Sequence, residues 1–197
     1  MAADLIGCRL VHRLPGRQRL ILRIVEVEAY RGDGSDAASH AHRGQTPRNA
    51  TMFGPAGRLY AYRSYGIHTC VNVVCGKPGQ ASAVLLRAGE PLDGLSRMRE
   101  LRGLDAQATA ERIARGPGRL AAALGLGLRD DGRSLLHTPL TLHPPETSAH
   151  AARIERGPRV GITKATDLPD RFFERDSRWV SPFRSGGKKR RTRSGVR

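Results

Sequence analysis

The segment "RIVEVEAY", residues 23–30, carries two carboxylates and a tyrosine in a largely apolar run. Side chains alternate along a strand, so Glu26, Glu28 and Tyr30 share one face of this segment. A carboxylate that is drawn out of water in such a place either pairs with a base or has its pKa raised. The segment therefore has two interpretations: a structural ion pair with some of the many arginines, or a carboxylate that takes part in chemistry.

The four tyrosines of the chain all lie between positions 30 and 65. Tyr65 stands beside Gly66 at the expected tip of a hairpin, where an exposed ring on a basic protein can be inserted between base steps of a duplex. Tyr30 and Tyr62 can form two walls around a flat ring, because base–aromatic stacking contributes about 1–3 kcal/mol per base. Core packing of Tyr30 and Tyr62, and a functionless exposed ring at position 65, are the alternatives.

The charge of the chain indicates a polyanionic partner. Lys and Arg number 34 against 18 Asp and Glu, which gives a net charge of +16 over 197 residues. Nucleic acid is the favoured partner, because counterion release drives its binding to basic proteins; an anionic membrane is disfavoured, since no basic amphipathic helix is visible. We predict one domain, residues 1–183, followed by a basic, disordered tail, residues 184–197, that holds seven bases and no acid.

Several classes of protein are disfavoured by simple patterns. There is no run of 18 apolar residues and no signal-like start, so we expect a soluble, cytoplasmic protein of bacterial type. We expect it to associate with the nucleoid by binding DNA. The three cysteines lack C-x-x-C spacing, which argues against a zinc site. "GPGRLA", residues 116–121, imitates a dinucleotide fingerprint, but the helix-like "ATAERIAR" precedes it where that motif needs a strand. We therefore predict neither a metal nor a cofactor.

The order of polar and apolar runs predicts alternating strands and loops before a helical region. The chain should open with the end of a helix and a strand, and a polar loop should cover residues 31–50. Helix in pieces, broken at "RGPGR", is expected over residues 91–128. Further strands are expected over residues 19–30, 58–63, 67–75, 81–88 and 152–163.

Three long stretches carry a family resemblance: "VEVEAYRGDGSDAASH", "RGQTPRNATMFGPAGRLYAYRSYGIHTCVNVV" and "VLLRAGEPLDGL". Together they resemble the 3-methyladenine (alkyladenine) DNA glycosylase family, and the resemblance continues through "GPGRLAAALGL", "PRVGIT" and "RWVS". It implies a base-excision repair enzyme that flips a damaged purine out of double-stranded DNA and hydrolyses its N-glycosidic bond. It also implies a monomer without cofactor, and a curved, mainly antiparallel sheet surrounded by helices, in one α+β domain with a protruding, DNA-intercalating hairpin.

The resemblance implies a catalytic centre around E-A-Y. Glu28 matches the general base that activates the attacking water, and Arg87 and the main-chain carbonyl of Val160 match the groups that help to hold that water. Glu26 receives no role. No lysine lies near these motifs to form a Schiff base, so we predict a monofunctional enzyme without lyase activity.

The resemblance also implies a pocket for the flipped base. Tyr30 and Tyr62 match the aromatic pair that sandwiches the base, and His40 matches the residue that closes the pocket by a hydrogen bond. Asn72 matches the asparagine that helps to reject guanine, and Tyr65 the residue that fills the gap in the duplex. Further DNA contacts are assigned to Arg48, Ile67 and Lys164.

Two other functions remain open from the residues alone. The first is a metal-dependent nuclease that uses the acidic and histidine side chains near the first motif, whose chemistry would suit Mg²⁺. The second is a non-catalytic nucleic-acid-binding protein whose tyrosines serve only as stacking platforms. The residues of the first alternative are Glu26, Glu28, Asp33, Asp36 and His40.

Overall fold

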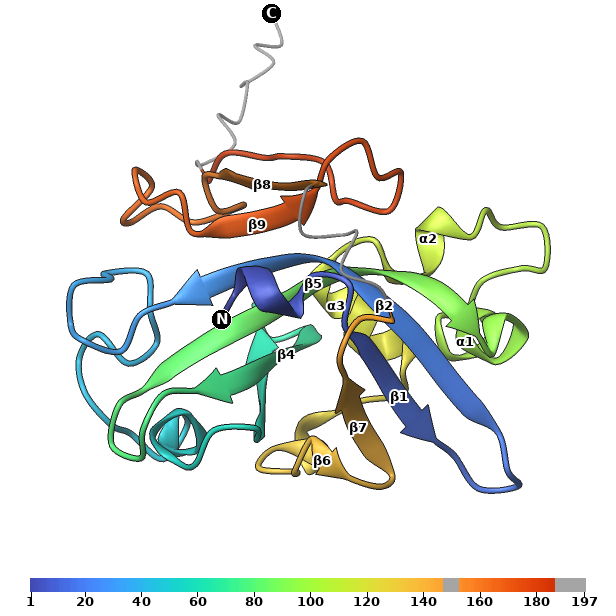
Figure 1. Ribbon diagram of the computed structural model, residues 1–197, viewed down its shortest axis with the longest axis horizontal. Helices are drawn as coiled ribbons and strands as arrows, with labels where there is room; N and C mark the ends of the chain where they lie inside the picture. Colours follow the sequence, from blue (N-terminus) through green and yellow to red (C-terminus); the bar gives the residue numbers. More distant parts are fainter. Residues whose placement is uncertain (147–152, 187–197) are drawn as a thin grey trace, which may run out of the picture.

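The computed structural model describes residues 1–146 and 153–186 (Figure 1). Within them, nine strands form one sheet in the order β3-β4-β5-β2-β1-β7-β6, while β9 pairs with β2 and with β8. Every pairing is antiparallel, which confirms a single α+β domain built on a curved antiparallel sheet. The strands are β1 (Arg9–Arg13), β2 (Arg19–Tyr30), β3 (Leu59–Ser64), β4 (His68–Cys75), β5 (Ser82–Asp93), β6 (Leu136–His137), β7 (Leu140–His143), β8 (Ile154–Gly157) and β9 (Arg171–Glu174).

Strand β2 contributes the first motif and lies between three other strands. One edge pairs with β5, whereas the opposite edge is divided between β1, on residues 19–23, and β9, on residues 26–28. The register between β2 and β5 shifts on either side of Glu26, and such irregularities bend a strand and increase its twist. Glu26 and Glu28 therefore lie where the sheet bends, and neither has solvent-exposed surface.

The helices are short and pack on one another and on the sheet, rather than surrounding it (Figure 1). The predicted interruption is confirmed, because Arg115 and Gly116 separate α2 from α3. Pro117 opens α3, a position that needs no N–H donor, and a Cβ at Gly118 would lie 2.8 Å from the Cβ of His68. The helices are α1 (Leu95–Leu101), α2 (Glu111–Ala114) and α3 (Pro117–Ala123), with 3₁₀ turns at Ala3–Leu5, Ala50–Phe53 and Leu128–Asp130.

The polar loop over residues 31–50 is confirmed and is held beside the end of β2. A Cβ at Gly32 would overlap the backbone of Ala81, so the chain can leave β2 in this direction only with glycine at this position. Farther along, Ala41 packs with Met52 in a small cluster beneath the loop. These contacts fix the loop at the edge of the sheet.

The predicted strand over residues 152–163 is wrong beyond Gly157, where β8 ends. Pro158 follows and lacks the N–H that a strand ladder needs, and Gly161 has a φ of 74°, outside the strand region. The chain therefore leaves the sheet here.

The end of the described chain lies against this departing segment. Arg184, the first residue of the predicted tail, accepts a 2.9 Å hydrogen bond from the amide of Gly161. Most of the predicted tail, residues 187–197, lies outside the described residues, as does residue 152. Every helix in the described ranges is too short or too polar to cross a lipid bilayer.

Candidate active site

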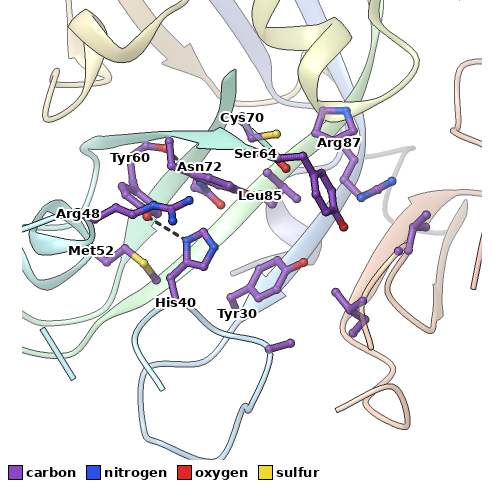
Figure 2. A pocket seen from close by; sticks show the side chains of 17 residues that line it. Tyr30, His40, Arg48, Met52, Tyr60, Ser64, Cys70, Asn72, Leu85 and Arg87 are labelled. Atoms are coloured by element: carbon purple, nitrogen blue, oxygen red, sulfur yellow. Dashed lines mark hydrogen bonds between the residues drawn. The ribbon is translucent and has the colours of Figure 1, made fainter. Parts of the chain in front are cut away.

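A cavity of about 430 Å³ opens beside the sheet near the first motif (Figure 2). Side chains from β2, β3, β4 and β5 line it, together with the 31–50 loop, the start of α3 and residues 160–162. Ligand pockets are commonly of this size, with apolar and aromatic walls and a few polar groups. The cavity can hold one flat heterocycle.

Two of the cavity walls are aromatic. The rings of Tyr60 and Tyr62 are stacked, with centroids 5.5 Å apart and planes 24° apart. His40 stands edge-on to Tyr62 at 4.5 Å, and a 3.0 Å hydrogen bond joins its Nδ1 to the Tyr60 hydroxyl, drawn dashed in Figure 2. Tyr30 borders the same cavity from β2. The pocket thus offers flat aromatic faces and an oriented imidazole.

Glu28 lies behind the cavity wall that Tyr30 forms and is not itself among the lining residues. Its Oε1 accepts a 2.6 Å hydrogen bond from the amide of Val160, and its Oε2 accepts bonds of 3.0 Å from the Tyr30 hydroxyl and 3.2 Å from Arg87 Nη1. All three donors belong to residues that line the cavity. The amide of Val160, rather than its carbonyl, reaches Glu28. One carboxylate therefore touches the pocket through three of its wall residues.

The pKa values of the site follow from its burial. Burial raises the pKa of Glu28, although the charge of Arg87 and the Val160 hydrogen bond oppose the shift. Burial, reinforced by Glu28, raises the pKa of Tyr30 well above its usual value, so that the hydroxyl stays protonated and donates. Partial burial and the nearby Arg48 lower the pKa of His40, which keeps the imidazole neutral at neutral pH. The site combines a proton acceptor with an uncharged imidazole.

A buried ion pair holds together the two loops that flank the pocket. Arg159 binds Asp36 in a bidentate manner, at 2.6 and 2.8 Å, and neither side chain is exposed. The same guanidinium donates a 3.0 Å bond to the carbonyl of Ala29 and lies 4.6 Å from the ring centroid of Tyr30. Asp36 belongs to the 31–50 loop, and Arg159 precedes Val160. This pair therefore positions a pocket wall and the donor to Glu28 together.

The residues assigned to DNA contacts are exposed, and two of them, Tyr65 and Arg48, also line the cavity. Tyr65 is 88% exposed at the turn between β3 and β4, with a φ of 49°, and Ile67 is 69% exposed beside it. Arg48 lines the cavity and is exposed, and Lys164 is exposed four residues after Val160. Their roles on DNA stay predictions.

The structure brings the predicted pocket residues together and adds others. The cavity is lined by eight of the residues assigned in the sequence analysis: Tyr30, His40, Arg48, Tyr62, Tyr65, Asn72, Arg87 and Val160. Asn72 donates 3.0 Å from Nδ2 to the carbonyl of Tyr60, which fixes its amide at the wall. His42, the neighbouring histidine, instead contacts the carbonyl of Gly34. The cavity residues that the sequence interpretation missed include Tyr60, Met52, Ser64 and Cys70.

The acidic residues of the nuclease alternative do not form one cluster. In residues 1–146 and 153–186, no group of three or more His, Cys, Asp or Glu side chains is placed to hold a metal ion. Glu26 and Asp36 are each bound by arginine, and Asp33 contacts Ser35 at the surface. The geometry gives that alternative no support.

Comparison with known proteins decides the family. The family model for methylpurine-DNA glycosylase (MPG) matches residues 1–178. The chain belongs to the methylpurine-DNA glycosylase family. A relative from Rhodopseudomonas palustris (strain ATCC BAA-98 / CGA009) is 50% identical over 184 residues, which cover 93% of this chain and 83% of the relative. One from Methanoculleus marisnigri is 50% identical over 186 residues, 92% of each chain, and both relatives bear provisional names as 3-methyladenine DNA glycosylases.

Membership of the methylpurine-DNA glycosylase family gives the pocket its general meaning. The protein is a DNA glycosylase for methylpurines, and DNA is its substrate. The resemblance seen in the sequence is thereby confirmed. The excess of basic residues and the aromatic cavity are both consistent with an enzyme that works on a base taken out of a DNA strand.

Proposed function

We propose that this glycosylase flips alkylated or deaminated purines out of double-stranded DNA and hydrolyses their N-glycosidic bond with a water activated by Glu28. Its substrates would be 3-methyladenine, 7-methylguanine, hypoxanthine and ethenoadenine, and its product an abasic site, without strand cleavage. The observation that carries the proposal is the fully buried Glu28 carboxylate, bound by three residues of the cavity wall. We propose further that it acts as a monomer, in the cytoplasm.

The hydrogen bonds of Glu28 leave one acceptor position on its carboxylate available for a water. Its Oε1 accepts only the Val160 amide among the described residues, and a carboxylate oxygen has two lone pairs. Because Glu28 has no exposed surface, the water must enter with a small movement of the covering groups. Glu28 would take a proton from this water as the oxygen attacks C1′ of the deoxyribose. Its negative charge would also stabilise the positive charge that develops on the sugar.

The wall residues explain a preference for damaged purines. An alkylated purine such as 7-methylguanine carries a positive charge, and the faces of Tyr30 and Tyr62 attract cationic rings. The neutral His40 adds no repulsion and offers a hydrogen bond to the base edge. Asn72 would disfavour the exocyclic amino group of guanine. The positions of these side chains around the cavity support the proposed roles.

The direct test separates a glycosylase from a nuclease or a lyase. An end-labelled duplex with one hypoxanthine or ethenoadenine is incubated with the protein in EDTA, and half of each sample is then treated with alkali. We expect cleavage at the lesion only after alkali. Breaks that form without alkali would contradict a monofunctional glycosylase, and loss of activity in EDTA would point to a metal-dependent nuclease.

The rate of 7-methylguanine excision should decrease as the pH is lowered. Because the pKa of Glu28 is raised, this decrease should begin at a higher pH than it would for a glutamate with an ordinary pKa. A general base acts when ionised, so activity is lost as the pH falls through its pKa, and the pKa of Glu28 is raised by burial. The leaving group carries a fixed charge and requires no protonation. The decrease of the rate at low pH, which is the acidic limb of the pH–rate profile, therefore reports on a group of the enzyme. Single-turnover rates across the acidic range measure it, and a rate that stays constant to below the usual pKa of glutamate would contradict the assignment.

Replacing Tyr65 with alanine should weaken binding to lesion-containing duplex without unfolding the protein. The ring is 88% exposed, so the fold gains little from it, whereas an inserted ring contributes about 1–3 kcal/mol by stacking. Titration of a fluorescent ethenoadenine duplex measures the flipped state. Tyr65→Phe keeps the ring and serves as the control, and equal signals from the alanine and phenylalanine variants would show that the ring is not inserted.

A further inference from the structure

Glu26, two residues before Glu28, is enclosed by four hydrogen bonds that no assigned role explains. Its Oε1 accepts bonds from Arg171 Nε at 2.7 Å, Ser181 Oγ at 2.9 Å and Arg87 Nε at 3.1 Å. Its Oε2 accepts a bond of 2.7 Å from the amide of Ser181. The side chain has no exposed surface. A buried charge with this many donors is held in one place.

Arg87 is the link between Glu26 and the reaction. Its guanidinium divides its three nitrogens among three partners: Nε to Glu26, Nη1 to Glu28 at 3.2 Å, and Nη2 to Ser181 Oγ at 3.4 Å. An arginine that is free to turn would favour a two-pronged contact with a single carboxylate, which is stronger and more specific. Glu26 and Ser181 therefore restrict Arg87 to one hydrogen bond with Glu28.

The balance of charge in this group supports the same conclusion. Two carboxylates, Glu26 and Glu28, face two guanidiniums, Arg87 and Arg171, and all four side chains are buried. Glu26 binds Arg171 and shares Arg87 with Glu28. The charge of Glu28 is therefore balanced by only part of one guanidinium charge. A fully paired Glu28 would remain ionised but would be a poor proton acceptor.

We propose that Glu26 is a positioning residue for the excision reaction: by holding Arg87 at Nε it keeps Glu28 incompletely paired and thus basic. The proposal rests on the function proposed above for Glu28. It assigns a role to strand β9, which carries Arg171, and to Ser181, because both residues donate hydrogen bonds to Glu26. It also explains why both glutamates of "EVEAY" lie on one buried face.

The direction of the effect follows from the groups that face Glu28. These are Arg87 from β5, Tyr30 and Glu26 from β2, Tyr62 from β3, Cys70 from β4 and the amide of Val160. Burial is the main cause of the raised pKa of Glu28; Arg87 opposes it, and Glu26 adds a smaller contribution in the upward direction. Removing the charge of Glu26 leaves Arg87 wholly to Glu28.

The test is the acidic limb of 7-methylguanine excision in Glu26→Gln. We expect the limb to move to lower pH by about one unit, since an opposite charge nearby shifts a pKa by about 1–3 units, and the rate above the limb to fall. Glu174→Gln is the matched control, because Glu174 is also buried on the neighbouring strand and paired, at 2.9 Å, with Arg23. We expect its limb to coincide with that of the wild type.

A purely structural Glu26 predicts a different result. Its loss would lower the rate by the same factor at every pH, and an unshifted limb in folded Glu26→Gln would overturn the proposal. If circular dichroism shows that this variant does not fold, Ser181→Ala decides, since it frees Arg87 Nη2; a smaller downward shift supports the proposal and no shift overturns it. Absence of any wild-type excision would instead refute the proposed function itself.

Discussion

Glu28→Gln is expected to abolish base release and to leave the protein folded. General-base catalysis contributes about 10²–10⁴-fold, and glutamine can neither accept the proton of the water nor stabilise charge on the sugar. Glutamine keeps an oxygen for the Val160 amide, which now bonds at 2.6 Å. Single-turnover excision of hypoxanthine measures the effect. A variant that retains a rate within about tenfold of the wild type would exclude Glu28 as the base.

The stability of this variant is an internal control. The pKa of Glu28 is raised in the fold, so its contribution to stability is full below the unfolded pKa and is lost as the pH rises through the folded pKa. At neutral pH the ionised carboxylate is therefore unfavourable in the fold, and a neutral amide avoids that cost. The amide also gives up the 3.2 Å pair with Arg87, so we expect Glu28→Gln to remain folded and to unfold in one cooperative transition in urea. A variant that is inactive because it unfolds would fail this control.

Arg159→Met is expected to have the largest effect on stability of the changes considered. It removes the partner of Asp36, whose carboxylate has no exposed surface, and breaking such a buried pair costs about 3–5 kcal/mol. Burial alone would raise the pKa of Asp36, but the hydrogen bonds and charge of Arg159 hold it below its usual value. The loss should appear in urea unfolding at neutral pH as a lower midpoint with an unchanged slope.

Two further variants test whether the pair itself is responsible. Adding Asp36→Asn to Arg159→Met removes the uncompensated charge, so the double variant should recover part of the lost stability. Arg97→Met, which breaks an exposed pair with Glu100, should cost much less. Additive losses in the double variant would show that Arg159 and Asp36 act independently, contrary to the geometry.

The sequence predicted the parts of the site that depend on local pattern. Strand alternation placed Glu26, Glu28 and Tyr30 on one face, and the Ser64-Tyr65-Gly66 connection predicted the exposed tyrosine. The role of Glu26 could not be predicted this way. Its partners lie 61, 145 and 155 positions away, so only the folded sheet brings them together.

Other features were missed for physical reasons that can be named. Strands β6, β7 and β9 have two to four residues each, too short to show a period of two. Tyr60 shares a strand face with Tyr62, which could have indicated a pocket residue, but the alternation of a strand does not show that this face lines a cavity and is not packed in the core. The Arg159–Asp36 pair spans 123 positions and left no local signal.

The most direct test of the account is the identity and amount of the released product. A duplex with one 7-methylguanine or hypoxanthine is incubated in EDTA with wild type and with Glu28→Gln, and free bases and abasic sites are counted by mass spectrometry. We predict one free base for each abasic site with the wild type and neither with the variant. Release of nucleosides or nucleotides, or equal base release from both proteins, would contradict a glycosylase that uses Glu28 to activate water.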